Sequence, residues 1–421
     1  MISLKNTDKL EEYILKISLY ILPLALIFSI ALVNLITAFF SLFFIVKFYY
    51  SSKLKLFVKN KLIIYLLLFN LYLIIISFFS HNIQISLLTS LFYLRFIFTS
   101  LVIGYILITY KNAIVGFAYS LWFFITLVVL DGYVQYFSGI NIFGWPQLDP
   151  VRVSGFFKEE LILGSYLSRL FPLAIFFIFY INESIKKSHI LFYLSLILLV
   201  LIDILVYLAG ERVALFYMLL STICIIIFIN RLRFLRILSL LISIFIIFSI
   251  NVYQPEVKSR MIDFTIEQIS KDSNDGSKKL NAFSTKHESH YKIALQMFKE
   301  KPFIGYGPKM FRYVCEKDIY DQEGCSTHPH NTYMQLLAET GIIGAIFIIL
   351  LLLYISYIFI IQFFNKFIFT SKKNYKDYEI ILYIAFLLSL WPLVPTGNFF
   401  TTWLNTIYFL PLGIHLFIQS R

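Results

Sequence analysis

The sequence predicts an all-α, polytopic membrane protein, and two observations carry that prediction. Of its 421 residues, 59% are hydrophobic and only 14% are charged, whereas soluble domains average about 45–50% apolar and about 25% charged residues. A helix needs ~20 predominantly apolar residues to cross a bilayer. Runs of that kind recur from one end of the chain to the other.

Twelve apolar runs predict about twelve transmembrane helices. In chain order the runs are 13–30, 31–50, 61–79, 87–109, 113–136, 161–181, 190–208, 212–229, 234–252, 335–364, 379–396 and 402–420. The first two are close enough in sequence to form a tight hairpin. The tenth is longer than the bilayer requires, so we expect it to tilt.

The links between these runs predict the orientation in the membrane. With a cytoplasmic N-terminus, every inside link carries Lys or Arg, namely 50–61, 110–112, 182–189, 230–236 and 365–378. The short outside links 80–86 and 397–401 carry neither. This is the distribution that the positive-inside rule describes, and it predicts that both termini are cytoplasmic. It also accounts for the net charge of +12 without a nucleic-acid partner.

The same orientation divides the chain into three parts. Residues 1–252 form an N-terminal membrane region of about nine helices, and residues 335–421 form a C-terminal region of about three. Residues 253–334 lie between them as one large segment outside the cytoplasm. In a bacterial inner membrane this segment is periplasmic, and the compartment permits disulfides.

Part of the outer segment is expected to be helical. In ESHYKIALQMFKEK, the residues Tyr291, Ala294, Leu295 and Phe298 recur at the spacing of one helical face, which predicts an amphipathic helix. Pro302, in the following KPFIGYGP, stops this helix, and Gly305 and Gly307 mark a turn.

Two of the three cysteines lie in the outer segment. Cys315 and Cys325 are ten residues apart, which allows a local disulfide in an oxidising compartment. His328 and His330 are close in sequence, so a zinc site is the alternative. No CxxC or HxxxH spacing is present, which favours the disulfide and leaves no expected metal-ligand set.

The segment STHPHNTYMQLLAETGIIG contains the strongest candidate for catalysis, His330. Thr332 and Gln335 have the spacing of a capping box, so a helix is expected to begin around Thr332. His330 and Asn331 then lie just before a helix N-terminus, whose positive end favours a neutral imidazole able to accept a proton. A purely structural cap is the alternative.

Two arginines on the same predicted membrane face are candidates for binding an anion. Arg212 lies in LAGERVALF at the outer end of the eighth run, and Arg152 lies in the outer link before the sixth. A guanidinium group can bind phosphate through two hydrogen bonds. An ion pair of Arg212 with Glu211, or an arginine reaching the interface, is the structural alternative.

Other charges fall inside the predicted runs: Arg95, Asp131, Arg169 and Asp203. Charge is costly in lipid, so each of these residues needs a partner or a function. Pairing between helices, such as Arg95 with Asp131 or Asp203, is one explanation. A proton or ion path through a transporter or flippase is the other.

The motifs resemble those of the O-antigen ligase and O-antigen polymerase superfamily of bacterial envelope enzymes. The ligase pattern of His-Asn, nine residues and Gly-x-x-Gly is met by His330-Asn331 and Gly341 to Gly344. ALQMFKEKPFIGYGPKMF is similar to the family's lead-in to that pattern, GERVALF to the segment that carries an essential arginine, and RVSGFF to an earlier arginine-glycine segment. Good agreement covers roughly residues 150–345.

The resemblance implies a GT-C-like glycosyltransferase without a cofactor or metal. It transfers a glycan from a polyprenyl (undecaprenyl) diphosphate carrier to a hydroxyl of lipid A-core, at the periplasmic face of the inner membrane. His330 would be the base, Arg212 and Arg152 would bind the diphosphate, and direct attack would invert the anomeric carbon. A polymerase that extends the carrier-linked glycan remains the alternative.

One departure from the family concerns the start of the amphipathic helix. Many relatives carry an arginine there, whereas this chain has His287 and His290. Together with His328 and Asn331, these two histidines are the residues expected to support the site.

Overall fold

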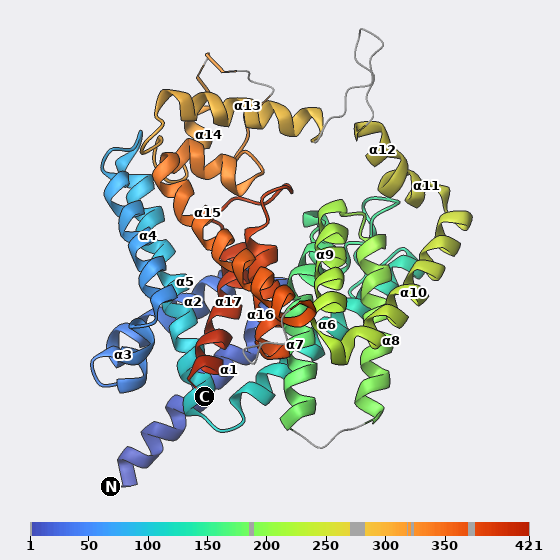
Figure 1. Ribbon diagram of the computed structural model, residues 1–421, viewed down its shortest axis with the longest axis horizontal. Helices are drawn as coiled ribbons and strands as arrows, with labels where there is room; N and C mark the ends of the chain where they lie inside the picture. The colour runs from blue at the N-terminus through green and yellow to red at the C-terminus, as the bar shows by residue number, and fades with distance from the viewer. Residues whose placement is uncertain are drawn as a thin grey trace. The chain divides into compact units, whose positions relative to one another are not determined.

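A computed structural model describes residues 2–184, 189–269, 283–317, 319–320, 324–368 and 375–420, and most of these residues are helical (Figure 1). The long helices are α1 Ile2–Phe28, α2 Ile30–Phe48, α4 Lys61–Ser77, α5 Ile83–Thr109, α6 Ala113–Ser138, α7 Leu163–Ser184, α8 His189–Leu208, α9 Arg212–Phe228, α10 Asn230–Tyr253, α13 Thr285–Glu300, α15 Thr332–Phe367, α16 Asp377–Leu390 and α17 Thr402–Gln419. The short ones are α3 Ser52–Val58, η1 Gly155–Glu160, α11 Pro255–Lys258, η2 Ser259–Asp263, α12 Phe264–Ile269 and α14 Phe311–Val314. Within these residues, extended pairing is limited to two isolated bridges.

Every predicted run overlaps a helix, but in the run 379–396 the helix ends at Leu390, and twelve membrane spans are not confirmed. Six described helices are long and apolar enough to cross a membrane: α2, α5, α6, α7 (over Leu163–Tyr180), α10 and α15. A seventh span is possible if α3 and α4, which meet at a 69° bend, are one broken span. The chain is therefore a multi-pass helical membrane protein. The centres of the links 182–189 and 365–378 lie outside the described residues.

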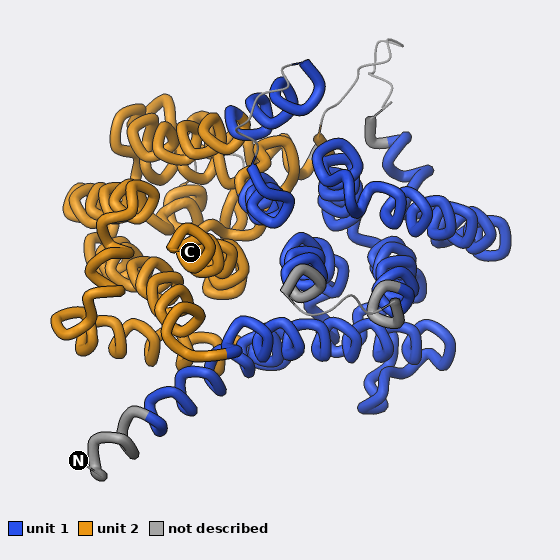
Figure 2. Tube along the Cα trace, turned by 60° about the horizontal axis from the view of Figure 1, so that its bottom comes forward, with its two compact units in different colours: residues 1–29, 112–279, 357–389 blue, residues 30–111, 280–356, 390–421 orange. Residues whose placement is uncertain are grey.

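The chain forms two compact units, each assembled from three separate stretches (Figure 2). Unit 1 comprises residues 1–29, 112–279 and 357–389, and unit 2 comprises residues 30–111, 280–356 and 390–421. These units are defined by internal contacts, whereas the predicted three parts, 1–252, 253–334 and 335–421, were defined by their position in the membrane. The predicted parts stay a prediction.

In unit 2, α5 is the central helix and packs against α2, α4 and α17. Asn82 caps α5 by accepting a hydrogen bond from the backbone N–H of Ile85. A Cβ on Gly413 of α17 would lie only 2.7 Å from Ile103. Small residues at such crossings let membrane helices approach closely, and Ser100 adds an interhelical hydrogen bond of 2.8 Å to the Phe409 carbonyl.

The amphipathic helix predicted in the outer segment is α13, which lies crosswise to α4 and α15 in Figure 1. Its buried face is not entirely the predicted one. Tyr291 and Ala294 are buried as expected, but Leu295 is 39% exposed, and Ile293 and Met297 are buried instead. The contacts of α13 with the chain that follows it, including α14, select that face.

In unit 1, a buried ion pair links α8 to α10. Both amino groups of Arg236 bind the carboxylate of Asp203, at 2.6 and 2.8 Å, and Thr222 and Ser243 complete the hydrogen bonds. This corrects two interpretations. Arg236 is buried in the helix bundle, so it does not act as a cytoplasmic charge of the link 230–236. Asp203 is paired with Arg236 and not with Arg95.

Candidate functional site

The histidine motif lies in a loop that is bound to the segment between α16 and α17. The backbone N–H of Thr396 donates to the carbonyl of His330 at 2.8 Å, and the side-chain amide of Asn331 donates to the carbonyl of Pro392 at 2.8 Å. His330 has a φ of 52°, in the left-handed region that residues with a Cβ rarely occupy. Such conformations persist only where the surroundings enforce them, and they cluster at functional sites.

Asn331, and not Thr332, caps α15. Its side-chain oxygen accepts hydrogen bonds from the two N–H groups at positions 333 and 334, at 2.9 and 3.1 Å. Thr332 instead bonds to the Thr396 hydroxyl at 3.0 Å, and the buried amide of Gln335 donates to Asn398 at 3.1 Å. The predicted start of the helix is confirmed, but the predicted capping box is wrong, because the preceding asparagine satisfies the first free N–H groups of the helix.

Gly341 breaks α15 into two helical segments. Its φ and ψ are 64° and −170°, and a Cβ there would lie 2.3 Å from the backbone of Phe303. The N–H of Ile342 donates to the Pro302 carbonyl at 2.8 Å. The helix predicted as continuous over 335–364 is therefore interrupted, because this position approaches another backbone in a conformation that suits only glycine.

The break at Gly341 joins the two motifs of the outer segment. The carbonyls of Ala338 and Glu339, which end the first part of α15, accept hydrogen bonds from the N–H groups of Tyr306 at 3.1 Å and Gly307 at 2.8 Å. A Cβ on Gly305 would lie 2.4 Å from the carbonyl carbon of Glu339. The Gly-x-Gly turn thus satisfies the carbonyls that a broken helix leaves open.

Glu339 is a residue that sequence reasoning missed. Its carboxylate is fully buried and accepts hydrogen bonds from the backbone N–H groups of Lys309 at 3.0 Å and Phe311 at 2.9 Å. The side-chain amide of Gln335 also donates to it, at 3.0 Å. A carboxylate within an apolar helix, two residues before the Gly-x-x-Gly pair, was the available signal.

Four histidines from two segments gather in unit 2. The ring of His330 lies 4.1 Å from that of His328, 5.2 Å from that of His290 and 5.8 Å from that of His287, measured between centroids. His290 is fixed by a 2.7 Å hydrogen bond between its Nδ1 and the carbonyl of Gly324. The structure therefore brings together all four histidines that the sequence singled out.

Burial and the neighbouring histidines both favour the neutral form of His330. Burial lowers the pKa of His330 to about 3, and the neighbouring histidines and Lys286 add repulsion. Burial likewise lowers the pKa of His328 to about 4. The predicted neutral imidazole agrees with these shifts, although burial contributes most, ahead of the neighbouring charges. Among the described residues, no group of three or more His, Cys, Asp or Glu has a geometry suited to a metal ion.

A disulfide closes the loop beside this cluster. Cys315, just after α14, is joined to Cys325, with their Cα atoms 5.2 Å apart. Cys325 directly follows Gly324, whose carbonyl binds His290. The bond therefore restrains the backbone that orients one of the four histidines.

The predicted arginines lie together in unit 1, around the turn between α8 and α9. Arg152 donates to the carbonyls of Ala209 and Leu161, both at 3.2 Å. Arg212 is the exposed first residue of α9 and donates to Thr265 at 3.3 Å. Glu211, the residue before it, accepts hydrogen bonds from the backbone N–H and the hydroxyl of Ser165.

A third arginine, which the sequence analysis missed, joins them. Arg260 of the π-helical turn η2 donates to the Gly210 carbonyl at 3.3 Å. Gly210 has a φ of 67°, and a Cβ there would lie 2.7 Å from Arg152 and 2.9 Å from Arg260. Burial lowers the pKa of Arg152, with repulsion from Arg260 as the second cause, while the charges of Glu211 and Asp149 oppose both. Three guanidinium groups and two carboxylates therefore act on this corner of unit 1.

The histidine cluster belongs to unit 2 and the arginine cluster to unit 1. Their convergence on one substrate stays a prediction. The comparison with known families bears on both clusters, since it covers parts of each unit.

Residues 194–349 match the model of the O-antigen ligase family. This match spans just over a third of the chain and includes Arg212, Arg260, the histidine cluster and the Gly-x-x-Gly pair. It supports membership of the O-antigen ligase and polymerase superfamily, as the motifs predicted. No curated protein sequence matches the chain. This match supports a function of the O-antigen ligase or polymerase type.

Proposed function

We propose that the chain is an O-antigen ligase-type glycosyltransferase of the bacterial inner membrane. It would transfer a glycan from an undecaprenyl diphosphate carrier to a hydroxyl of lipid A-core at the periplasmic face. The observation that carries this proposal is the backbone of His330, which has a positive φ at the start of the family motif, where burial lowers the pKa of its imidazole.

His330 acts as the general base. Its neutral imidazole accepts the proton of the acceptor hydroxyl while the hydroxyl oxygen attacks the anomeric carbon. The bond from that carbon to the phosphate oxygen breaks, and the diphosphate leaves with the electron pair. One displacement inverts the configuration. A second support is the N-terminus of α15 directly after His330, which attracts negative charge.

Arg152, Arg212 and Arg260 bind the diphosphate. Guanidinium groups offer paired donors to phosphate oxygens, and they balance the charge that grows on the leaving group as its bond breaks. This arrangement needs no metal ion in the step. The mutual repulsion of the three groups is relieved when the anion binds.

His330→Ala tests this assignment. Purified full-length protein is supplied with a lipid-linked glycan and lipid A-core, and the variant is expected to lose transfer by at least 100-fold. His81→Ala, which removes an exposed histidine outside the cluster, is the matched control and keeps wild-type turnover. Near-normal transfer by a folded His330→Ala protein would contradict the assignment.

Ligase and polymerase activities are separated by the glycan that accumulates when the gene is deleted. A ligase predicts long chains left on the carrier, and a polymerase predicts single repeat units. Accumulation of single repeats would replace the ligase proposal with polymerisation while keeping the role of His330.

A further inference from the structure

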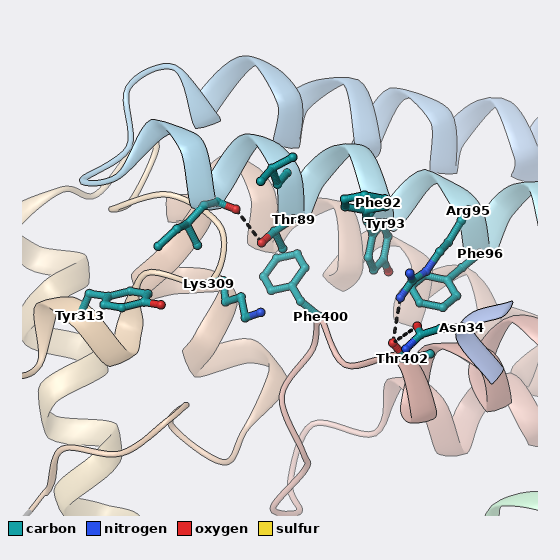
Figure 3. A pocket seen from close by; sticks show the side chains of 12 residues that line it. Asn34, Thr89, Phe92, Tyr93, Arg95, Phe96, Lys309, Tyr313, Phe400 and Thr402 are labelled. Atoms are coloured by element: carbon teal, nitrogen blue, oxygen red, sulfur yellow. Dashed lines mark hydrogen bonds between the residues drawn. The ribbon is translucent and has the colours of Figure 1, made fainter. Parts of the chain in front are cut away.

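Unit 2 contains a cavity that the proposed chemistry does not use. Its volume is about 530 Å³, and it lies along α5, between the segment that follows the Gly-x-Gly turn and the start of α17 (Figure 3). The side chains of Lys309 and Arg95 point into it from its two ends. None of the twelve described residues that line it is acidic.

Arg95 keeps a positive charge at one end of this cavity. One of its amino groups donates to the hydroxyl of Thr402 at 2.8 Å, and that hydroxyl donates to Asn34 at 2.9 Å. Its guanidinium lies over Phe96, 4.8 Å from the ring centroid. The buried Nε makes no hydrogen bond among the described residues. These neutral partners orient the guanidinium and leave its charge uncompensated.

Lys309 supplies the second cation. Its backbone has a φ of 66°, an unfavourable conformation that the hydrogen bond from its N–H to Glu339 helps to enforce. Burial lowers the pKa of the Lys309 ammonium and Arg312 adds repulsion, while the charge of Glu339 opposes both. The backbone conformation thus holds a partly buried ammonium at the second end of the cavity.

The wall along α5 is apolar and partly open. Leu88 is 46% exposed and Phe92 is 57% exposed, on a helix that is long and apolar enough to cross a membrane. Tyr93 and Phe400 line the middle of the cavity, between the two cations. A ligand that fits this cavity would place an apolar group against α5 and a negatively charged group beside Lys309 and Arg95.

We propose that this cavity binds the phosphate group of an anionic amphiphile, and that this amphiphile is the acceptor of the transfer reaction. Phosphate matches the guanidinium and ammonium donors, and a lipid chain matches the exposed face of α5. The acceptor role rests on the proposed function.

The chain limits how far the cavity can be from His330. Thr396, which binds the His330 carbonyl, is four residues from Phe400 in the cavity wall. Four extended residues span at most about 14 Å. Since these residues all belong to unit 2, an acceptor held by its phosphate in the cavity can extend a hydroxyl to His330.

Binding is tested with a fluorescent short-chain phosphatidic acid on the full-length protein in detergent. The matched diacylglycerol, which lacks the phosphate, is the ligand control. Arg95→Gln and Lys309→Gln are each expected to weaken phosphatidic acid binding about tenfold or more. Lys299→Gln, at an exposed position of α13, is expected to change it less than twofold.

Two outcomes overturn the binding site. One is diacylglycerol binding as tightly as phosphatidic acid, and the other is unchanged affinity in Lys309→Gln, whose loop position tolerates the substitution. Displacement of phosphatidic acid by an equal concentration of inorganic pyrophosphate would show a site for free phosphate and would overturn the amphiphile. If Arg95→Gln does not fold, phosphatidic acid binding is measured in Arg95→Lys and Lys309→Gln instead, and these two variants decide whether the cavity is the binding site.

The acceptor role has a separate readout. In the transfer assay, Lys309→Gln should raise the KM for lipid A-core about tenfold and leave the KM for the carrier-linked glycan within twofold. An unchanged acceptor KM overturns this role without affecting the assignment of His330. Normal transfer by His330→Ala would defeat the proposed function, and the phosphatidic acid measurements would still decide whether the cavity binds an anion.

Discussion

The charge state of His330 links its surroundings to its chemistry. Its ring is partly buried beside three other histidines, and its pKa is lowered to about 3. The protein is therefore expected to hold the imidazole ready to accept a proton at any physiological pH. A bound anion nearby would raise this pKa, since it favours the protonated form.

The pH dependence of transfer should reflect both states of His330. The base must be neutral, so activity is lost as the pH falls through its pKa. For the free protein we expect kcat/KM to be flat between about pH 5 and 8 and to fall only at lower pH. The acid limb of kcat, which reports the complex with the anionic donor, is expected at higher pH. A kcat/KM limb near the ordinary histidine pKa of about 6.5 would contradict this.

The arginine corner of unit 1 should require the guanidinium group and not charge alone. Arg212→Lys keeps the charge but loses the paired donors, so we expect kcat/KM for the donor to fall by about 10- to 100-fold. The measurement is initial rate against donor concentration. Arg231→Lys, in the predicted cytoplasmic link, is the control and should have no effect. Equal activity of Arg212→Lys and wild type would exclude a guanidinium clamp.

At the scale of elements, two glycine motifs and a disulfide hold the site of unit 2 together. The break in α15 leaves two backbone carbonyls without a partner in the helix, and N–H groups of the Gly-x-Gly turn after α13 donate hydrogen bonds to them. Glu339 then binds the chain that leaves this turn. The spacing of nine residues in the family motif is the length of helix between the histidine loop and this junction.

Gly341→Ala should destabilise this junction. With φ 64° and ψ −170°, Gly341 lies in a region that is nearly restricted to glycine and costs other residues on the order of 1–3 kcal/mol, and the backbone of Phe303 lies within 2.3 Å of the added atom. Gly144→Ala is the matched control, because its φ is 78° but nothing lies within 4 Å. We expect a larger loss of Tm in Gly341→Ala, measured by thermal unfolding in detergent. Equal losses would show that the close approach is unimportant.

Removing the disulfide should loosen the loop that orients His290. A closed loop of ten residues stabilises a fold by about 2–3 kcal/mol in the chain-entropy model. The double variant Cys315→Ser, Cys325→Ser is expected to have a lower Tm and reduced turnover. Cys224→Ser, at the buried free cysteine, is the control. A wild-type Tm that does not respond to reductant would contradict a structural role for the bond.

At the scale of the whole molecule, the predicted orientation places the histidine loop and the arginine corner on one side of the membrane. Arg236 no longer supports that orientation, since it is buried against Asp203. The remaining links still differ in their content of Lys and Arg.

This orientation is testable by labelling single introduced cysteines with a membrane-impermeant thiol reagent. His81→Cys, at an exposed position in the link between α4 and α5, should react in cells whose outer membrane alone is permeabilised. Lys111→Cys, exposed between α5 and α6, should react only after the inner membrane is opened. The opposite pattern would place the histidine loop in the cytoplasm.

The sequence by itself determined the places of the apolar helices, the start of α15 and the resemblance to the O-antigen ligase family, because apolar runs, helix starts and motif spacings are local patterns. Only the tertiary structure decided which distant residues meet. It paired Arg236 with Asp203, brought Arg260 to Gly210 and rotated the buried face of α13. These contacts depend on packing between segments far apart in the chain, where burial and hydrogen bonding select a partner that no local pattern records.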